Sequence, residues 1–329
     1  MDKKINWGIL GCANIADYRV VPALLSEVTN GRLYALASRN GGERFDKMVA
    51  QYKPEKSYLS YEALLEDPAV DAVYIPLPNA LHKEWVIKAA DAGKHVLCEK
   101  PLGLNSAEVE AMIEAGRRNH VIIMEAFANM HSPLYPAIRE LIAQGVIGEL
   151  RLVNSFFGCP VPEIAGSIHY AKDMGAGSLY NVGSYNILTI REITGREPVS
   201  VKAVGRLDAR GQDGIDLSHY VVMDLGDGIM GVAQGSHDTA FHRGLEVLGT
   251  QGFIHFDRTP NAWGELEIHY TNQQGSFSKK VFAADTYGAE LQQFGDCILH
   301  GAQPRMSLAS SLANTKIYEQ IFQEIGLER

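Results

Sequence analysis

The chain has 329 residues, of which 46% are hydrophobic and 21% charged, and its 39 acidic against 30 basic residues give a net charge of −9. This length predicts two domains, each able to bury its own core, and the mixed composition excludes an intrinsically disordered chain. The negative charge argues against a nucleic-acid binder, which needs a basic surface to neutralise phosphates.

The first part of the chain alternates short apolar runs with amphipathic stretches. Strands are expected at residues 5–10, 33–38, 69–76, 95–99 and 121–127, and helices at 15–28, 42–52, 61–66, 80–92 and 107–119. Strands that are apolar throughout and alternate with helices predict a parallel sheet covered on both faces. The N-terminal part is therefore expected to be a doubly wound α/β domain.

Local signals mark several helix ends. Ser60 is a candidate N-cap of the helix at 61–66, and Asn105 with Glu108 resembles a capping box before the helix at 107–119. Gly93 is a natural C-cap for the helix at 80–92. Pro22 lies inside the helix expected at 15–28 and is expected to bend its first turns.

After Pro133 the pattern changes. A helix at 134–144, a strand at 149–157 and a loop-rich segment at 158–177 precede a helix at 178–194. Further strands with short turns between them are expected at 199–206, 220–225, 229–235, 244–249, 253–256, 265–270 and 278–282, followed by helices near 287–300 and 307–325. Successive strands with short turns predict an antiparallel sheet, and we place the domain boundary at about residue 123.

The four cysteines, Cys12, Cys98, Cys159 and Cys297, form no C-x-x-C pair and have no histidine at zinc spacing. We therefore expect neither a disulfide framework nor a metal site. The N-terminal stretch MDKKINWGILG has no apolar segment of signal-peptide length, and no run approaches ~18 apolar residues. These features predict a cytoplasmic protein that does not enter a membrane.

The first candidate site is residues 8–16, GILGCANIA, where the first strand turns into the first helix. Small residues there let main-chain N–H groups approach a pyrophosphate, whose charge the helix N-terminus attracts. Gly11, Ala13 and Ala16 fill the three places of the G-x-G-x-x-G pattern only loosely, and a plain strand–helix turn is the alternative. The position at the first strand of a βαβ series favours dinucleotide binding. The expected contacts are Gly11, Cys12, Ala13, Asn14 and Ile15.

Ser38 and Arg39 end the second strand, where an NAD-specific domain usually has an acidic residue for the ribose 2′-hydroxyl. A hydroxyl and a guanidinium suit a 2′-phosphate instead. The alternative is a solvated surface arginine. We favour NADP(H) over NAD(H) as the cofactor.

Two further motifs follow strands three and four, where the ligand crevice of an open α/β sheet lies. Pro78, Asn79 and His82 follow strand three and are expected to meet the cofactor, although Asn79 is also a candidate helix cap. Glu99 and Lys100 precede Pro101 at the end of strand four, and the Lys100–Pro101 bond is a candidate for a cis conformation. A lysine that loses hydration in a crevice has a lowered pKa, so Lys100 is suited to hold a substrate oxygen or to exchange a proton. The alternative is a surface lysine paired with Glu99.

The fifth candidate site is the segment 175–185, GAGSLYNVGSY, in the second domain. Asn181 and Tyr185 are four residues apart, so they share one helix face. An amide and a phenol that project together suit hydrogen bonds to a hydroxylated substrate. The alternative is that Tyr185 is a core aromatic residue.

Together these motifs resemble the glucose–fructose oxidoreductase, inositol dehydrogenase and MocA family (Gfo/Idh/MocA), over essentially the whole chain. The N-terminal turn, PNxxH at 78–82, EKP at 99–101, MEAF at 124–127 and GxGSLxxVGxY at 175–185 occur in the family's order. The resemblance implies an NADP-binding Rossmann domain at 1–123. It also implies an α+β domain at 124–329, with a large open, mostly antiparallel sheet that binds substrate and forms a homodimer or homotetramer.

The resemblance also assigns residues. Lys100 matches the family's catalytic lysine, and Tyr185 falls where many members have a catalytic His and where the dihydrodiol dehydrogenase and glucose–fructose oxidoreductase branches have a Tyr. The residues that match cofactor contacts are Gly11, Ala13, Ser38, Arg39, Asn79, His82 and Glu99. Within the family, the chain looks closest to the dihydrodiol/xylose dehydrogenase and anhydrofructose reductase group. It departs from the pattern at Asn181, where members usually have Asp, and at Met130, where that group often has Arg.

We therefore predict an NADP-dependent dehydrogenase or reductase that transfers a hydride between nicotinamide C4 and a secondary alcohol or ketone of a sugar, polyol or cyclic diol. Tyr185 would donate or accept the proton, Lys100 would lower the pKa of Tyr185 or bind the same oxygen, and Asn181 would hold a neighbouring hydroxyl. Candidates for lining the substrate pocket are Phe157, His169, Tyr170, His237 and His242.

Two alternatives stay open. One is a regulatory protein of the same fold that binds NADP(H) without turnover, which the loss of the carboxylate at position 181 permits and the presence of Lys100 and Tyr185 opposes. The other is an enzyme for a different substrate class, such as an imine or a bilin.

Overall fold

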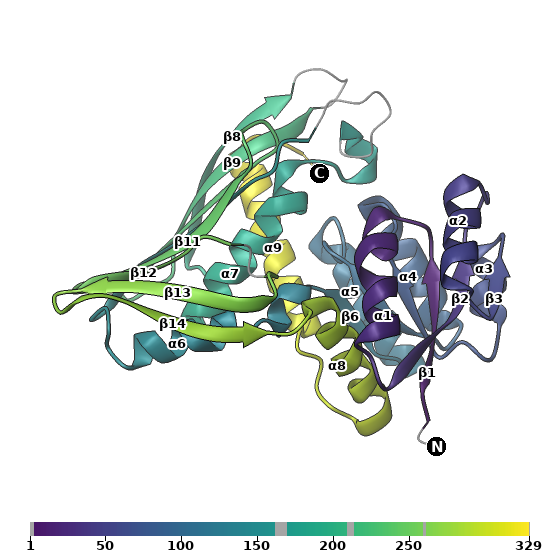
Figure 1. The fold of residues 1–329 in the computed structure, drawn as a ribbon. Coiled ribbons are helices and arrows are strands. Elements are labelled where there is room, and N and C mark those ends of the chain that lie inside the picture. The colour runs from purple at the N-terminus through teal and green to yellow at the C-terminus, as the bar shows by residue number, and fades with distance from the viewer. Residues whose placement is uncertain (1–2, 162–169, 209–213, 259–260, 329) are drawn as a thin grey trace. The chain divides into compact units, whose positions relative to one another are not determined.

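The structure is a computed structural model that describes residues 3–161, 170–208, 214–258 and 261–328 (Figure 1). Its contacts divide the chain into two compact units. The first unit comprises Met1–His131 and Asp285–Leu312, and the second comprises Ser132–Ala284 and Ala313–Arg329. The expected site residues are therefore distributed over two bodies, which are described in turn.

The first unit contains a six-stranded sheet in the order β3-β2-β1-β4-β5-β6, in which every neighbouring pair is parallel. The strands are β1 (Ile5–Leu10), β2 (Gly31–Ala37), β3 (Lys56–Tyr58), β4 (Ala72–Ile75), β5 (His95–Glu99) and β6 (Ile123–Ala126). The chain leaves β1 first towards β2 and later towards β4, so the direction of winding reverses at β1. This confirms the doubly wound sheet, and it predicts a ligand crevice at the carboxyl ends of the strands beside β1.

The helices of this unit connect these strands or follow the last of them in the sequence. They are η1 (Ala16–Val20), α1 (Val21–Ser26), α2 (Glu43–Tyr52), α3 (Tyr61–Glu66), η2 (Asn79–Leu81), α4 (His82–Asp91), α5 (Ser106–Asn119), η3 (Ala128–His131) and α8 (Thr286–His300). The expected caps are present, because Ser60 Oγ accepts from Ala63 N at 3.2 Å and Asn105 Oδ1 accepts from Glu108 N at 3.0 Å. Gly93 has a φ of 74°, a left-handed conformation that ends the helix before it.

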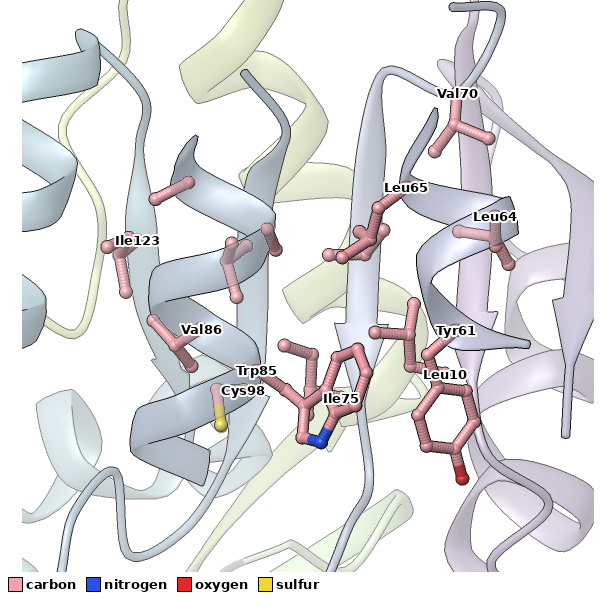
Figure 2. Close-up of a cluster of buried hydrophobic side chains, with 14 of the residues drawn as sticks. Leu10, Tyr61, Leu64, Leu65, Val70, Ile75, Trp85, Val86, Cys98 and Ile123 are labelled. Carbon is pink, nitrogen blue, oxygen red and sulfur yellow. The ribbon is translucent and has the colours of Figure 1, made fainter. Parts of the chain in front are cut away.

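An apolar core lies on one side of the parallel sheet, between its strands and helices α3, α4 and α5 (Figure 2). Trp85 and Tyr61 meet edge to face in it, with ring centroids 4.8 Å apart. The close-up shows Ile75 of β4 and Cys98 of β5 under the same layer. This packing holds the ends of β1, β4 and β5 in fixed register, which is what a site at those ends needs.

The second unit contains an eight-stranded sheet in the order β14-β13-β12-β11-β7-β10-β9-β8. Its strands are β7 (Leu150–Gly158), β8 (Ser200–Asp208), β9 (Ile215–Asp224), β10 (Met230–Ser236), β11 (His242–Gly249), β12 (Gly252–Phe256), β13 (Gly264–Asn272) and β14 (Gly275–Ala283). Only the pairing of β7 with β10 is parallel among the strand pairs described. The prediction of a large, mostly antiparallel sheet is confirmed.

Helices pack against one face of this sheet: α6 (Leu134–Ala143) contacts β13 and β14, and α7 (Ser184–Thr194) contacts β7 and β10. Two short helices, η5 (Lys172–Met174) and η6 (Leu179–Gly183), precede α7. The division between the units falls within α9 (Leu308–Glu324), whose second half packs on η6 through Tyr318 and Tyr180. The opposite face of the sheet carries exposed side chains such as Tyr220 and Val222.

The unit boundaries differ from the predicted division at residue 123. β6 continues the parallel sheet beyond that point, because Ala126 pairs with Glu99. The helix α8 also belongs to the first unit, since Asn30 Nδ2 donates to Asp296 Oδ1 at 2.7 Å and Trp7 contacts Phe294 at 5.5 Å between ring centroids. Such contacts join segments more than 260 residues apart, and no local pattern announces them.

Candidate active site

The turn after β1 depends on a glycine at position 11. Gly11 has a φ of 113°, and a Cβ there would lie 3.0 Å from Leu77 Cδ2. Its N–H donates to Ala37 O at 2.9 Å, which joins the ends of β1 and β2. Cys12, Ala13 and Ile15 are half-buried and Asn14 is exposed. The turn is thus a small-residue cradle at the start of a helix, as dinucleotide binding requires.

The helix that follows begins differently from the one expected. Residues 16–20 form a π-turn, and α1 starts at Val21. Pro22 has no N–H to donate, so the regular hydrogen-bond pattern is interrupted at this point, and Val21 N donates to Ala16 O, five residues back. The proline therefore changes the helix type before it, where the sequence had suggested a bend.

Basic side chains gather beside this turn. Arg39 is exposed. The hydroxyl of Tyr61 lies close to Gly11. Burial raises the pKa of Tyr61, and the positive charge of Arg39 opposes this rise. Ser38 Oγ donates to Gly41 O at 3.2 Å. Arg44 Nη1 donates to Cys12 O at 3.3 Å, a contact that the sequence interpretation missed. The signal was available, because a second arginine follows Arg39 in the first turn of the next helix.

The segment after β4 has two kinds of residue. Pro78 and Asn79 are half-buried, and the N-cap positions of η2 and α4 are Pro78 and Leu81. His82 is fully buried, with Nδ1 2.8 Å from Pro101 O and Nε2 2.8 Å from Leu77 O. Burial nevertheless lowers the pKa of His82. In this position the ring links the segments that follow β4 and β5.

Lys100 follows β5 and is half-buried. Loss of hydration lowers its pKa to about 8, against the opposing charges of Glu99 and Glu125. The Lys100–Pro101 peptide bond is cis, as the sequence had suggested. An ammonium group with this pKa can both donate a hydrogen bond and exchange a proton near neutral pH.

Three buried or half-buried carboxyl groups lie around this lysine's strand. Glu99 accepts from Tyr74 OH at 2.6 Å, and Glu125 accepts from Leu102 N at 2.8 Å. Glu290 of α8 is 2% exposed, and burial together with the charge of Glu99 raises its pKa well above the usual range. The sequence interpretation gave no chemical role to Glu125, which stands in the MEAF segment at 124–127, or to Glu290, which stands in no motif.

Met130, where the dihydrodiol group of the family often has Arg, is buried at the end of η3. An arginine nevertheless reaches this place, because Arg305 Nε donates to Met130 O at 2.8 Å. Burial and the nearby charge of Arg305 lower the pKa of His131 to about 4. Arg305 lies in the segment between α8 and α9.

In the second unit, the segment 175–191 presents two side chains. All its residues are buried except Asn181 and Tyr185, which are half-buried. The start of the segment is fixed by Asp216, which accepts from Ser178 Oγ at 2.7 Å and from Leu179 N at 2.6 Å. The π-turn η6 and the helix α7 therefore display one amide and one phenol on the face that solvent can reach.

The neighbours of this face include some of the expected pocket residues. The Phe157 ring lies 6.4 Å from that of Tyr185, and Asn181 Nδ2 lies 3.0 Å from His237 Nε2. Phe157 and His242 both line a small cavity of about 80 Å³ at the ends of β7, β10 and β11. Tyr170 OH donates to Val161 O at 2.8 Å. His169 lies outside the described residues.

In the part of the chain that the structure describes, no helix is both long and apolar enough to span a bilayer. Across residues 3–161, 170–208, 214–258 and 261–328, no three His, Cys, Asp or Glu side chains gather where they could hold a metal ion. The four cysteines are free thiols.

Comparisons with known proteins agree with this arrangement. Residues 5–127 match the model of an oxidoreductase family with an NAD-binding Rossmann fold, and residues 135–255 match the Gfo/Idh/MocA C-terminal domain. A dTDP-3,4-didehydro-2,6-dideoxy-alpha-D-glucose 3-reductase of Actinomadura kijaniata is 32% identical, over 96% of this chain and 94% of that protein. A trans-1,2-dihydrobenzene-1,2-diol dehydrogenase of Xenopus laevis is 28% identical, over 98% of each chain.

A solved structure extends the comparison to three dimensions. It is a tyrosine-to-phenylalanine mutant of KijD10, a 3-ketoreductase from Actinomadura kijaniata, in complex with TDP-benzene and NADP. It superposes with a TM-score of 0.91 and 29% identity, and the match covers 98% of each chain.

Proposed function

The chain belongs to the Gfo/Idh/MocA family of NAD(P)-binding oxidoreductases, and we propose that it uses NADP(H) to interconvert a secondary alcohol and a ketone of a sugar, polyol or cyclic diol. The bound nicotinamide supplies or takes up the hydride. The chain's own residues bind and orient the cofactor and the substrate, and they move the proton. The observation that carries the proposal is Lys100, a half-buried lysine of lowered pKa at the carboxyl end of β5.

The first unit fits a dinucleotide with a 2′-phosphate. The left-handed backbone at Gly11 leaves room where a Cβ would crowd Leu77, so main-chain groups can approach a pyrophosphate. Arg39 and Arg44 bring two positive charges to the ends of β1 and β2, where NAD-specific domains usually have a carboxylate. The NADP bound in the KijD10 structure supports the same choice of cofactor. Contacts by Cys12, Ala13, Asn14, Ile15, Pro78, Asn79 and Glu99 belong to this proposal.

The proposal gives three residues a role in the reaction. Tyr185 donates the proton to the substrate oxygen in reduction and accepts it in oxidation. Lys100 donates a hydrogen bond to the same oxygen and stabilises the negative charge that develops there. Asn181 holds a neighbouring hydroxyl of the substrate.

The relatives narrow the substrate class. One relative is named as a sugar-nucleotide 3-reductase and another as a diol dehydrogenase. The substrates in these two names share a ring that has an oxygen on the carbon next to the reacting one. We therefore expect a cyclic substrate with vicinal oxygens. An NADP(H)-binding regulator of the same fold is the second candidate, and Asn181 in place of the family's usual carboxylate is the observation that favours it.

The test follows nicotinamide absorbance with NADP⁺, and separately with NAD⁺, against aldoses, inositols, polyols and cyclic trans-diols. Turnover that is faster with NADP⁺ supports the proposal. Faster turnover with NAD⁺ contradicts the assignment of Ser38 and Arg39. Tight NADPH binding without turnover of any compound in the panel supports the regulator instead.

We also propose that the chain forms homodimers or homotetramers through the exposed face of the eight-stranded sheet. Val204, Tyr220 and Val222 are neighbours on that face and are 68%, 46% and 45% exposed. Contiguous exposed apolar side chains are typical of interfaces. Sedimentation of the wild type should give an oligomer, and Tyr220→Asp should shift it towards the monomer.

The free cysteines support a reducing compartment such as the cytoplasm.

A further inference from the structure

His237 contacts one of the two residues that the second unit displays. It follows β10, it is 2% exposed, and its Nε2 lies 3.0 Å from Asn181 Nδ2. The contact joins the end of a strand to the π-turn η6, which are 56 residues apart in the sequence. Neither the motif at 175–185 nor the resemblance to the family pointed to this pair.

The main chain holds His237 at a fixed place. Its N–H donates to Leu217 O at 2.8 Å, and its carbonyl accepts from Val161 N at 3.0 Å. Just before it, Ser236 O accepts from Cys159 N at 2.8 Å. The residue thus continues the hydrogen bonding of β10 to both neighbouring strands. These bonds fix the main chain of His237, and its buried ring meets the Asn181 amide from the strand end.

The direction of the hydrogen bond follows from the atoms involved. With Nδ2 of the amide facing the ring, Nε2 accepts the hydrogen bond, and the neutral ring then has its proton on Nδ1. The oxygen of the same amide lies on the other branch of the side chain and is an acceptor. A carboxylate at position 181 can only accept, so it would require a proton on Nε2. Asparagine therefore reverses the polarity of this contact.

We propose that His237 is a positioning residue that turns the Asn181 amide so that its oxygen accepts a hydrogen bond from a substrate hydroxyl. That hydroxyl is on the carbon next to the reacting one. The inference rests on the proposed function and deepens it, because it selects vicinal diols and α-hydroxy ketones over simple alcohols and ketones. The buried ring determines the preference without touching the substrate.

The orientation is tested without turnover. In protein labelled with ¹⁵N-histidine, the imidazole signals that vanish in His237→Gln belong to His237. We expect Nε2 without a proton in the wild type and with a proton in Asn181→Asp. A protonated Nε2 in the wild type would overturn the inference.

The selectivity is tested with trans-1,2-cyclohexanediol and cyclohexanol as probes, with NADP⁺. His237→Leu should lower kcat/KM for the diol about tenfold more than for cyclohexanol, mainly through KM, which is the loss expected for one hydrogen bond. His237→Gln retains an acceptor and should restore part of the preference, while His300→Leu, at the exposed end of α8, is the control.

Equal losses for both alcohols in His237→Leu would show a merely structural role and overturn the inference. Absence of turnover with both probes in the wild type would contradict the proposed function. The imidazole signals would still decide the orientation of the pair, so the two failures are distinguishable.

Discussion

The two units build their parts of the site by different means. In the first, the site residues follow the carboxyl ends of parallel strands, so Gly11, Ser38 and Lys100 come to one edge of the sheet by topology alone. In the second, one π-turn and one helix display Asn181 and Tyr185, and the partner His237 comes from a distant strand end. In the parallel sheet, the order of the strands determines which residues meet at the carboxyl edge. In the antiparallel sheet, the neighbours of a site residue depend on tertiary packing.

Removal of the lysine side chain in the first unit is expected to have the largest effect on the reaction. Lys100→Ala should lower kcat by ~10²–10⁴-fold, because the substrate oxygen loses its charged hydrogen-bond donor. NADPH affinity, measured by fluorescence titration, should change little, since the side chain acts on the substrate. Turnover close to that of the wild type would remove Lys100 from the reaction.

Within the first unit, a substitution at the end of β2 should weaken cofactor binding and leave the chemical step unchanged. Arg39→Ala removes the charged contact to the 2′-phosphate that we propose, and it should weaken NADPH binding by ~10–100-fold. NADH binding should be unaffected, which makes NADH the internal control. An equal loss for both cofactors would mean that Arg39 acts on the structure of the turn.

The lowered pKa of Lys100 gives the reaction a pH dependence. Lys100 loses its positive charge as the pH rises through about 8, so ketone reduction should slow above that pH. Lys100→Arg keeps its charge throughout this range and should remove the limb from the profile of kcat/KM. An unchanged limb in Lys100→Arg would assign it to another group.

The smallest effect concerns Glu290, behind the same strand. The pKa of Glu290 is raised in the folded state. Its protonated carboxyl therefore contributes most to the free energy of unfolding below the ordinary glutamate pKa of ~4.3. That contribution is lost as the pH rises towards the pKa of the folded state. Glu290→Gln should therefore unfold at a higher temperature than the wild type at neutral pH, by ~2–4 °C if the gain is about 1 kcal/mol. The difference should vanish near pH 4, and a constant difference would contradict this account.

The sequence predicted the first unit well because its signals are local. Apolar runs give β1, β4 and β5, Ser60 and Asn105 give their helix starts, and the strand order gives the crevice. The short strand β3 escaped because Lys56–Tyr58 is only partly buried and has no apolar run. The π-turn before Pro22 escaped because the residue pattern of a π-turn is that of an ordinary helix.

The remaining misses depend on long-range contacts. Arg44 and Glu290 take part only because the fold brings them to Cys12 and Glu99. His237 was a candidate for the substrate pocket, but its contact with Asn181 was not predicted. The placement of α8 in the first unit has the same cause, through Asn30 and Asp296. Periodicity and spacing report which face a residue occupies, and they do not report which distant segment covers it.

The proposed function requires Lys100 and Tyr185 to act in one chemical step. It is tested most directly by single-turnover ketone reduction in Lys100→Ala, Tyr185→Phe and the double variant, with NADPH bound to saturation. The account predicts that each single change lowers the rate strongly and that the double change is little worse than the more severe single one, because residues that act as a unit are not additive. Losses that multiply, or a rate in Tyr185→Phe equal to that of the wild type, would contradict it.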